Sequence, residues 1–358
     1  MRLNGVEAAR GVAALLVVMF HVTSILSIPS TYGRVAFDGL FNFGRAGVDF
    51  FFVLSGFIIA YVHAGDIGRP DRIPTYARRR LWRIYPLYWL TSLAFQALLL
   101  VSPRADGADR DWPHILMGWA LVPESAAPVL EVGWSLRHEL LFYALFGLML
   151  LHRRAGQAAL AVWAAGIVWN AVYMMGTGTW FFTGALHIVV FRVFNIEFFF
   201  GLAVAHLVRS RPPWRPTLLL ACGTVIFLAT GLAESFGPRA VEWPPRHIAY
   251  ALGAALVLYG LATLDRAGRS RVPAWMVAVG RASYSIYLVH VLVALVLGYG
   301  VRLLLPHIPI PIGIAFIALV TGSVLAGMVL SRVVEQPLLR WSRRDDARLT
   351  YPDRPKSG

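Results

Sequence analysis

The sequence predicts an all-α, polytopic membrane protein with about ten transmembrane helices, and three observations support this fold class. Of its 358 residues, 58% are hydrophobic and 15% are charged, whereas soluble domains carry roughly a quarter charged residues. Apolar runs of about 20 residues, the length needed to cross a bilayer, recur along the chain. The charged residues gather between these runs, and all but one of the 33 cations are arginine.

The apolar runs give ten expected spans. They lie near 9–28, 46–63, 84–102, 134–152, 158–175, 185–208, 217–233, 247–264, 283–301 and 311–333. The run at 113–122 is too short to cross and is bounded by proline, so it predicts an interfacial segment. Residues 1–341 therefore form one integral membrane domain in this interpretation. The polar tail 342–358 is expected to be disordered in the cytoplasm.

The arginine distribution predicts the orientation of the chain. With the N-terminus placed inside, the inner segments carry 24 cations and the outer segments carry seven, while Arg137 and Arg192 lie within spans. This excess on alternate segments is the positive-inside pattern, so both termini are expected in the cytoplasm. The net charge of +14 could indicate a nucleic-acid partner. Cations dispersed between apolar runs, however, do not form a nucleic-acid-binding face.

The first apolar run places two ionisable residues on one helix face. Arg10 and His21 are eleven residues apart, so at about 100° and 1.5 Å per residue they share an azimuth and lie roughly 16 Å apart. An interrupting histidine and the many later spans predict a retained helix rather than a signal peptide. A polar residue in a span is costly and marks function by default. His21 is the best general-base candidate, because histidine titrates near neutrality.

The second span carries a carboxylate and a hydroxyl. Asp49 is expected near its outer end, either as an interfacial carboxylate or as a site residue. Ser55 is expected at a depth close to that of His21. It is followed by Gly56, and this pair is also typical of a small-residue contact between helices.

The fourth span carries Glu139, about two turns below the outer face. Two interpretations of this carboxylate remain open. It could form a salt bridge with Arg137, Arg192 or His21, or it could serve as the carboxylate of a catalytic site.

Four later polar residues are expected to have structural roles. Asn195 and Glu197 of the sixth span are expected to pair with Arg192. His290 is interpreted as a hydrogen-bonded packing histidine, and Glu335 as a helix-end contact to an inner arginine.

Two arginines before the third span indicate an anion site. Arg80 and Arg83 are three residues apart and therefore lie on one helix face. A cluster of inner arginines can simply anchor topology, but two aligned guanidiniums also suit phosphate recognition.

The sequence gives no signal for metal or nucleotide chemistry. One cysteine, Cys222, excludes an intrachain disulfide and a thiolate cluster. No His/Cys set at ligand spacing, phosphate-binding glycine loop or Gly-x-Ser-x-Gly elbow is present, so no bound metal is expected.

Taken together, these motifs resemble the acyltransferase-three superfamily of bacterial membrane O-acyltransferases over residues 3–341. The segments that carry the resemblance are the run from Arg10 to His21, residues 47–57, Arg80 with Arg83, Trp134-Ser135-Leu136 with Glu139, residues 283–290, and Glu335-Gln336-Pro337. The Asp49-Phe50-Phe51-Phe52 version is similar to the branch that acetylates exopolysaccharide. Arg137 and His138 depart from the family pattern around Glu139.

The resemblance implies a ten-helix enzyme of the bacterial inner membrane. Such enzymes move an acyl group, usually acetyl, from cytoplasmic acyl-CoA to a carbohydrate hydroxyl. Acyl-CoA is thus implied as a donor substrate, with no bound cofactor. The family's site residues match Arg10, His21, Arg80, Arg83 and Glu139. The other implied partners are a polysaccharide or lipid-linked oligosaccharide acceptor and the lipid bilayer, with no nucleic acid.

The expected mechanism follows from the polar residues of the spans and from the family resemblance. The CoA phosphates would bind Arg80 and Arg83 with Arg10, and His21 would take the proton of the acceptor hydroxyl.

A carboxylate, Glu139 or Asp49, would hold His21 in its tautomer. No covalent acyl-enzyme is required, although Ser55 keeps that route open.

Two other classes of protein are alternatives to an acyltransferase. An exporter of a glycan or lipid-linked sugar would also need polar residues in mid-membrane, but the chain has no detectable internal repeat. A membrane sensor or scaffold would leave those polar residues unexplained.

Overall fold

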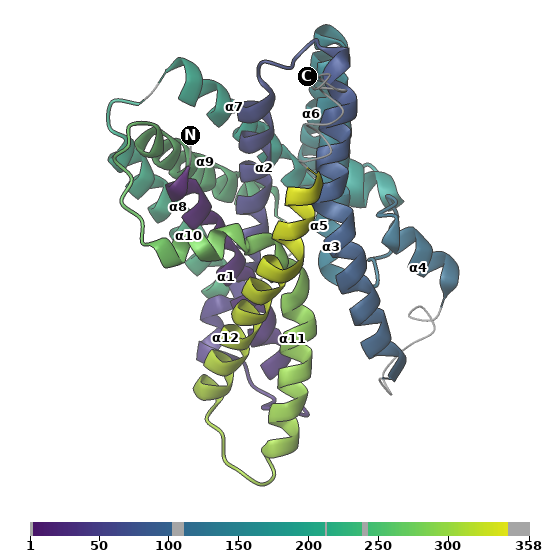
Figure 1. The fold of residues 1–358 in the computed structure, drawn as a ribbon, viewed down its shortest axis with the longest axis vertical. Helices are drawn as coiled ribbons and strands as arrows, with labels where there is room; N and C mark the ends of the chain where they lie inside the picture. Colours follow the sequence, from purple (N-terminus) through teal and green to yellow (C-terminus); the bar gives the residue numbers. More distant parts are fainter. Residues whose placement is uncertain (1–2, 102–110, 212, 238–242, 343–358) are drawn as a thin grey trace, which may run out of the picture.

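The computed structural model describes residues 3–101, 111–211, 213–237 and 243–342, and within these ranges the chain is helical with no β-strand (Figure 1). The α-helices are α1 (Asn4–Leu26), α2 (Gly47–His63), α3 (Ile73–Val101), α4 (Trp112–Trp119), α5 (Trp134–Leu151), α6 (Arg153–Thr177), α7 (Ile196–Ser210), α8 (Pro216–Phe236), α9 (Pro244–Arg266), α10 (Ala274–Arg281), α11 (Ser283–Leu304) and α12 (Ile312–Leu330). Short 3₁₀ and π segments connect or extend them, namely η1 (Ala36–Ala46), η2 (Pro70–Arg72), η4 (Glu131–Gly133), η5 (Leu186–Val190), η6 (Val193–Asn195) and η7 (Ser331–Glu335). The all-α prediction is confirmed.

Eight helices in the described part of the chain are long and apolar enough to cross a membrane. They coincide with eight of the ten predicted spans. The other two predicted spans fall in α3 and α5, which are helical but carry Arg83 and the Arg137–Glu139 segment. The chain is therefore a multi-pass helical protein, while the count of ten and the orientation stay predictions. The predicted tail 342–358 lies outside the described residues, except for Ser342.

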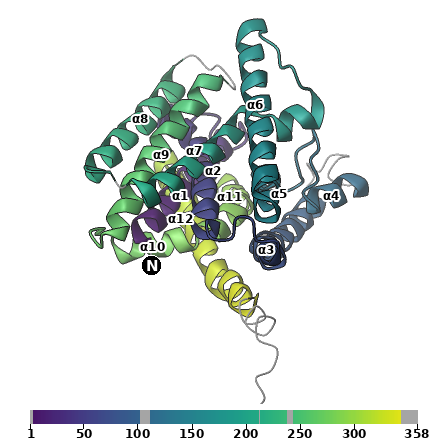
Figure 2. The ribbon, with the colours of Figure 1, turned by 90° about the horizontal axis from the view of Figure 1, so that it is seen from above.

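Helix α1 lies at the centre of the fold. Seen from above, α1 and α2 lie between α8 and α9 on one side and α3, α5 and α6 on the other (Figure 2). Helix α1 packs against α2, α9, α10, α11 and α12. It begins at Asn4 rather than near residue 9, so Arg10 lies almost two turns inside it and His21 lies five residues before its end.

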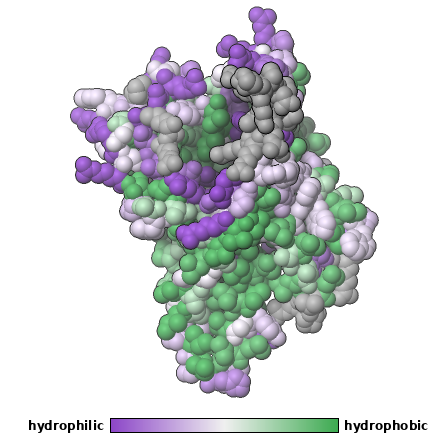
Figure 3. Space-filling model, in the orientation of Figure 1, coloured by the Kyte–Doolittle hydropathy of each residue, from purple (hydrophilic) through white to green (hydrophobic). Residues whose placement is uncertain are grey.

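The helix ends form two groups, as alternation across a bilayer requires. At one end of the bundle, the Asp265 carboxylate accepts hydrogen bonds from the backbone N–H of Gly5 and Val6 at 2.9 and 3.1 Å, which joins α9 to the start of α1. At the other end, the Tyr32 hydroxyl donates to the Ile310 carbonyl at 2.8 Å. Hydrophilic residues gather at the end that carries the starts of α1 and α3 (Figure 3). An apolar belt covers the part below it.

Two glycines allow α2 and α7 to cross at close range. A Cβ at Gly56 would collide with the backbone carbonyl of Phe198, and a Cβ at Gly201 would collide with that of Val53. Small residues at such a crossing are typical of helix packing in membranes. The predicted small-residue contact at Gly56 is confirmed.

The segment predicted as interfacial contains the short helix α4. The Tyr85 and Tyr88 hydroxyls and the Trp89 indole N–H donate to carbonyls at its C-terminal end, at 2.8–2.9 Å. These bonds hold the C-terminal end of α4 against α3.

Two structural predictions in the sixth span are wrong about the partner. The Asn195 side chain contacts the His138 ring at 2.9 Å and donates to the Val189 carbonyl, also at 2.9 Å. Glu197 lies 3.5 Å from the ring of His247. Both residues begin the second half of a broken span, where helix α7 starts, so their side chains turn inward to α5 and α9.

Candidate active site

Two cavities lie on either side of a shared wall within the helix bundle. The Arg83 chamber has a volume of about 690 Å³, and the His21 chamber has a volume of about 450 Å³. Three side chains line both chambers: Val48, Phe52 and Tyr287. Both volumes lie in the range of small-molecule sites, roughly 300–1,000 Å³.

The Arg83 chamber gathers most of the predicted site residues. Of the seven, five line it: Arg10, Ser55, Arg80, Arg83 and Glu139. Two arginines that the sequence did not single out, Arg79 and Arg281, line it as well. The same lining contains three carboxylates, Glu7, Glu139 and Glu335, so five guanidiniums outnumber them and leave an excess of positive charge that suits a polyanionic ligand.

Specific partners hold these arginines in place. Arg83 forms an ion pair with the buried Glu335 and lies 4.9 Å from the ring centre of Tyr284. The predicted contact of Glu335 with an inner arginine is thereby confirmed. Arg10 pairs with Glu7 at 3.1 Å.

Arg80 is hydrogen-bonded to a histidine ring rather than to a carboxylate. Its Nη2 donates to the His63 Nε2 at 3.0 Å, and the opposite ring nitrogen of His63 lies 2.8 Å from Asp66. Because an arginine can only donate, the hydrogen of the His63 ring must lie on Nδ1, toward Asp66.

Glu139 contacts two hydroxyl groups and none of the partners proposed for it. Ser55 donates to its Oε1 at 3.0 Å, and the Tyr143 hydroxyl donates to the same oxygen. The expected salt bridge to Arg137, Arg192 or His21 is therefore wrong within the described residues. Ser55, Glu139 and Tyr143 form a polar cluster in the wall of the Arg83 chamber.

His21 lies in the second chamber and is paired with another histidine. The His290 Nε2 lies 3.1 Å from the His21 Nδ1, which is also 3.0 Å from the Val17 carbonyl. The other nitrogen of His290, Nδ1, contacts the Tyr287 carbonyl at 2.7 Å. His290 is fully buried.

These contacts assign the hydrogens on both rings. A carbonyl only accepts, so the His290 Nδ1 must carry its hydrogen, and in the neutral ring Nε2 is then an acceptor. The His21 Nδ1 faces two acceptors, Val17 and His290, and must be the donor. The His21 Nε2 therefore keeps a free lone pair, which is the atom that a general base uses.

This arrangement corrects the prediction that Glu139 or Asp49 orients His21. Among the described residues, the hydrogen-bonding partners of its ring are the Val17 carbonyl and His290, and neither is a carboxylate. His290, predicted to be a packing residue, takes the orienting position. The two histidines are 269 residues apart in the chain, so no local pattern could have paired them.

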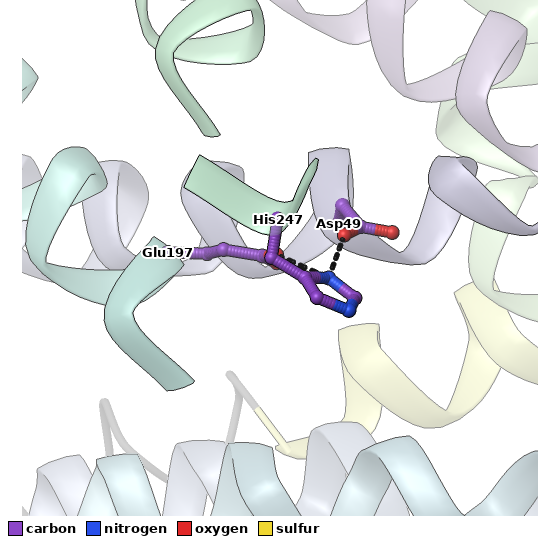
Figure 4. Close-up of side chains that lie close together, drawn as sticks. All are labelled: Asp49, Glu197 and His247. Carbon is purple, nitrogen blue, oxygen red and sulfur yellow. Dashed lines mark hydrogen bonds and ion pairs between the residues drawn. The ribbon is translucent and has the colours of Figure 1, made fainter. Parts of the chain in front are cut away.

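Asp49 belongs to a different cluster in the wall of the His21 chamber. Its Oδ1 lies 2.7 Å from the His247 Nδ1, and Glu197 completes the group (Figure 4). All three residues are buried, and their nitrogen and oxygen atoms lie within 4.8 Å of one another. Two carboxylates and an imidazole are also a donor set that a divalent cation could use.

The fold and these chambers define a multi-pass membrane protein with an enzyme-like polar interior. The acyltransferase-three family model, described as an acyltransferase domain, matches residues 3–332, so the chain belongs to this family and is an acyltransferase. Membership favours the acyltransferase interpretation over the exporter and sensor alternatives.

Two curated relatives are similar along most of their length. The acyltransferase MdmB of Streptomyces mycarofaciens is 28% identical over 387 aligned positions, which cover 99% of this chain and 96% of the relative. The exopolysaccharide production protein ExoZ of Rhizobium meliloti (strain 1021) is 28% identical over 317 positions, covering 85% and 92%. No solved structure matches the chain.

Proposed function

We propose that this protein is an inner-membrane O-acyltransferase that moves an acyl group, most simply acetyl, from cytoplasmic acyl-CoA to a carbohydrate hydroxyl. The observation that carries the proposal is the pair of chambers with a shared wall. One chamber is lined by five arginines, and the other holds a histidine with a free ring nitrogen. Similarity to an exopolysaccharide production protein supports the carbohydrate acceptor.

The Arg83 chamber would bind the donor. Acyl-CoA carries several phosphates, and arginine binds phosphate through charge-assisted, often bidentate hydrogen bonds. Arg10, Arg80 and Arg83 would share this role with Arg79 and Arg281. The arginine excess of the inner segments supports a cytoplasmic entrance to this chamber.

The reaction would take place at the shared wall. The His21 Nε2 takes the proton of the acceptor hydroxyl as its oxygen forms a bond to the thioester carbonyl carbon. The carbon–sulfur bond then breaks, and the departing CoA thiolate takes the proton back from the imidazolium. The transfer is direct, although the Ser55 hydroxyl beside Glu139 would allow an acyl-serine.

The test is transfer of label from acetyl-CoA labelled in the acetyl group. Permeabilised membranes containing the protein, in which both faces are accessible, are incubated with this donor and with surface polysaccharide of the source strain from which O-acetyl groups have been removed by alkali. The wild type should label the polysaccharide, and His21→Ala should lose at least about a hundredfold of the rate at equal protein level, the usual minimum contribution of a positioned base.

Two results would contradict the proposal. Label that never enters carbohydrate would exclude the acceptor class. A His21→Ala variant that retains most of the rate would assign the base to another residue.

A further inference from the structure

The cluster of Asp49, Glu197 and His247 has no part in donor binding or in the base described above. Asp49 and Glu197 lie in the first turns of α2 and α7, and His247 lies near the start of α9. The N-terminus of a helix carries partial positive charge, which favours a carboxylate there. Three helix starts that converge therefore tolerate two buried carboxylates that would otherwise repel each other.

Glu197 is the least satisfied member of the cluster. It is fully buried, and neither of its carboxylate oxygens has a hydrogen-bond partner among the described residues. The nearest donor, the His247 Nδ1, lies 3.5 Å away and is closer to Asp49, at 2.7 Å. A buried carboxylate that lacks donors is costly. A ligand in the His21 chamber could therefore supply the hydrogen-bond donors that Glu197 lacks.

The surroundings indicate what kind of ligand supplies them. The ring of Phe194 lies 5.6 Å from that of His247, and the ring of Trp134 lies 5.2 Å from that of Phe194. All three side chains line the His21 chamber. Aromatic side chains next to a few hydrogen-bond acceptors match a molecule with apolar faces and hydroxyl edges, which is the chemistry of a sugar.

We propose that the Asp49–Glu197–His247 cluster is the acceptor subsite, which binds adjacent hydroxyls of a sugar unit through the two oxygens of Glu197. A sugar hydroxyl can both donate and accept, so it is complementary to a carboxyl group in either protonation state. The subsite rests on the proposed function, because it assumes a carbohydrate acceptor. It places that acceptor in the same chamber as the His21 Nε2.

A divalent cation is the competing occupant. The same chamber is lined by four arginines and four carboxylates, so its net charge does not select between the two occupants. The His247 Nδ1 lies 2.7 Å from the Asp49 Oδ1, a contact that requires a hydrogen on this nitrogen and leaves it no lone pair for a metal ion. This hydrogen bond favours sugar hydroxyls over a metal ion.

The experiment measures the two substrates separately, with acetyl-CoA and the de-O-acetylated polysaccharide as probes. Glu197→Met keeps the shape but removes both acceptors, and should raise the polysaccharide KM at least about tenfold, while the acetyl-CoA KM stays within about twofold. Glu197→Gln retains one acceptor oxygen, so its polysaccharide KM should lie between those of the wild type and Glu197→Met. Asp71→Asn, at an exposed carboxylate that lines neither chamber, should leave both values unchanged.

Each outcome decides the question. An unchanged polysaccharide KM in Glu197→Met, or an equal rise of both KM values, would overturn the subsite. One metal ion per purified wild-type chain that is lost in Glu197→Met, together with loss of activity in EDTA, would replace it with a metal site. A wild type that labels no carbohydrate would instead overturn the proposed function, and the subsite with it.

Discussion

At the residue scale, the chemistry of His21 depends on which of its two ring nitrogens carries the hydrogen. Two acceptors fix that hydrogen on Nδ1: the Val17 carbonyl and the Nε2 of His290, whose ring is itself locked by the Tyr287 carbonyl. In the proposed mechanism, His290 acts through His21 as a positioning residue.

This chain predicts opposite results for two amide substitutions at His290. The side-chain oxygen of glutamine can reach the place of Nε2 and still accept from His21, whereas that of asparagine reaches only the place of Nδ1. His290→Gln should keep the acyl-transfer rate within about tenfold, and His290→Asn should lose about a hundredfold and shift the pH dependence of kcat. Equal rates in the two variants, or a loss confined to protein level, would reduce His290 to a packing residue.

The arginines of the Arg83 chamber differ in the partner that each would leave without a hydrogen bond if it were removed. Truncating Arg83 would leave the buried carboxylate of Glu335 with the Ser285 and Ser331 hydroxyls as its donors among the described residues. Loss of such a partner destabilises the fold as well as the site. Arg80 faces a histidine that needs no counter-charge, so its variants report on donor binding more cleanly.

We expect Arg80→Ala to raise the acetyl-CoA KM about tenfold with little change in kcat, because phosphate contacts made equally in ground and transition states appear in KM. Arg80→Lys keeps the positive charge but loses the two parallel N–H donors of the guanidinium, so its acetyl-CoA KM should lie between those of the wild type and Arg80→Ala. The control is Arg215→Ala, which removes the same charge from an arginine outside both chambers. Saturation curves with an unchanged KM for Arg80→Ala would leave this arginine as a topology anchor.

At the element scale, the crossing of α2 and α7 positions the site, because α2 carries Asp49 and Ser55 while α7 carries Glu197. The close approach depends on Gly56, whose hydrogen faces the Phe198 carbonyl. We predict that Gly56→Ala destabilises the protein by about 1–3 kcal/mol through overpacking.

Gly176→Ala is the matched control for this substitution. Gly176 is also helical, but a Cβ there would meet no atom within 4 Å, so the exchange should be neutral or slightly stabilising. Thermal unfolding of both variants in detergent provides the comparison, and equal midpoints would show that α2 and α7 can adjust their separation.

The helices could be predicted from the sequence because each apolar run is long, but their ends could not be. Helix α1 starts five residues before the predicted span, since the polar residues Asn4 and Glu7 are helical too. The reason is tertiary: Asp265 satisfies the N–H groups at the start of the helix, and Glu7 pairs with Arg10. A hydropathy pattern does not contain such partners.

The same limit applies to the site. The cost of placing polar groups in a membrane correctly singled out residues that line the two chambers, including His21, Asp49 and Glu139. The partners of these residues could not be predicted, because His290 and His247 come from helices far along the chain. Their pairing depends on how the helices pack.

At the scale of the whole molecule, the proposed mechanism assigns the donor and the acceptor to two separate chambers. Val48, Phe52 and Tyr287 separate the arginine-lined cavity from the one that holds His21. With the predicted orientation, the first chamber opens toward the cytoplasm, where acyl-CoA is made, and the second lies on the outer side of the wall. The donor and acceptor would then never need to share an entrance.

The most direct test of this account uses sealed membrane vesicles of known orientation and external labelled acetyl-CoA, which does not cross a bilayer. Inverted vesicles expose the cytoplasmic face, so they should transfer label to polysaccharide enclosed in the vesicle, and His21→Ala vesicles should not. Right-side-out vesicles should stay unlabelled until they are permeabilised. Equal labelling of intact vesicles of both orientations, or labelling of right-side-out vesicles alone, would contradict the two-chamber mechanism.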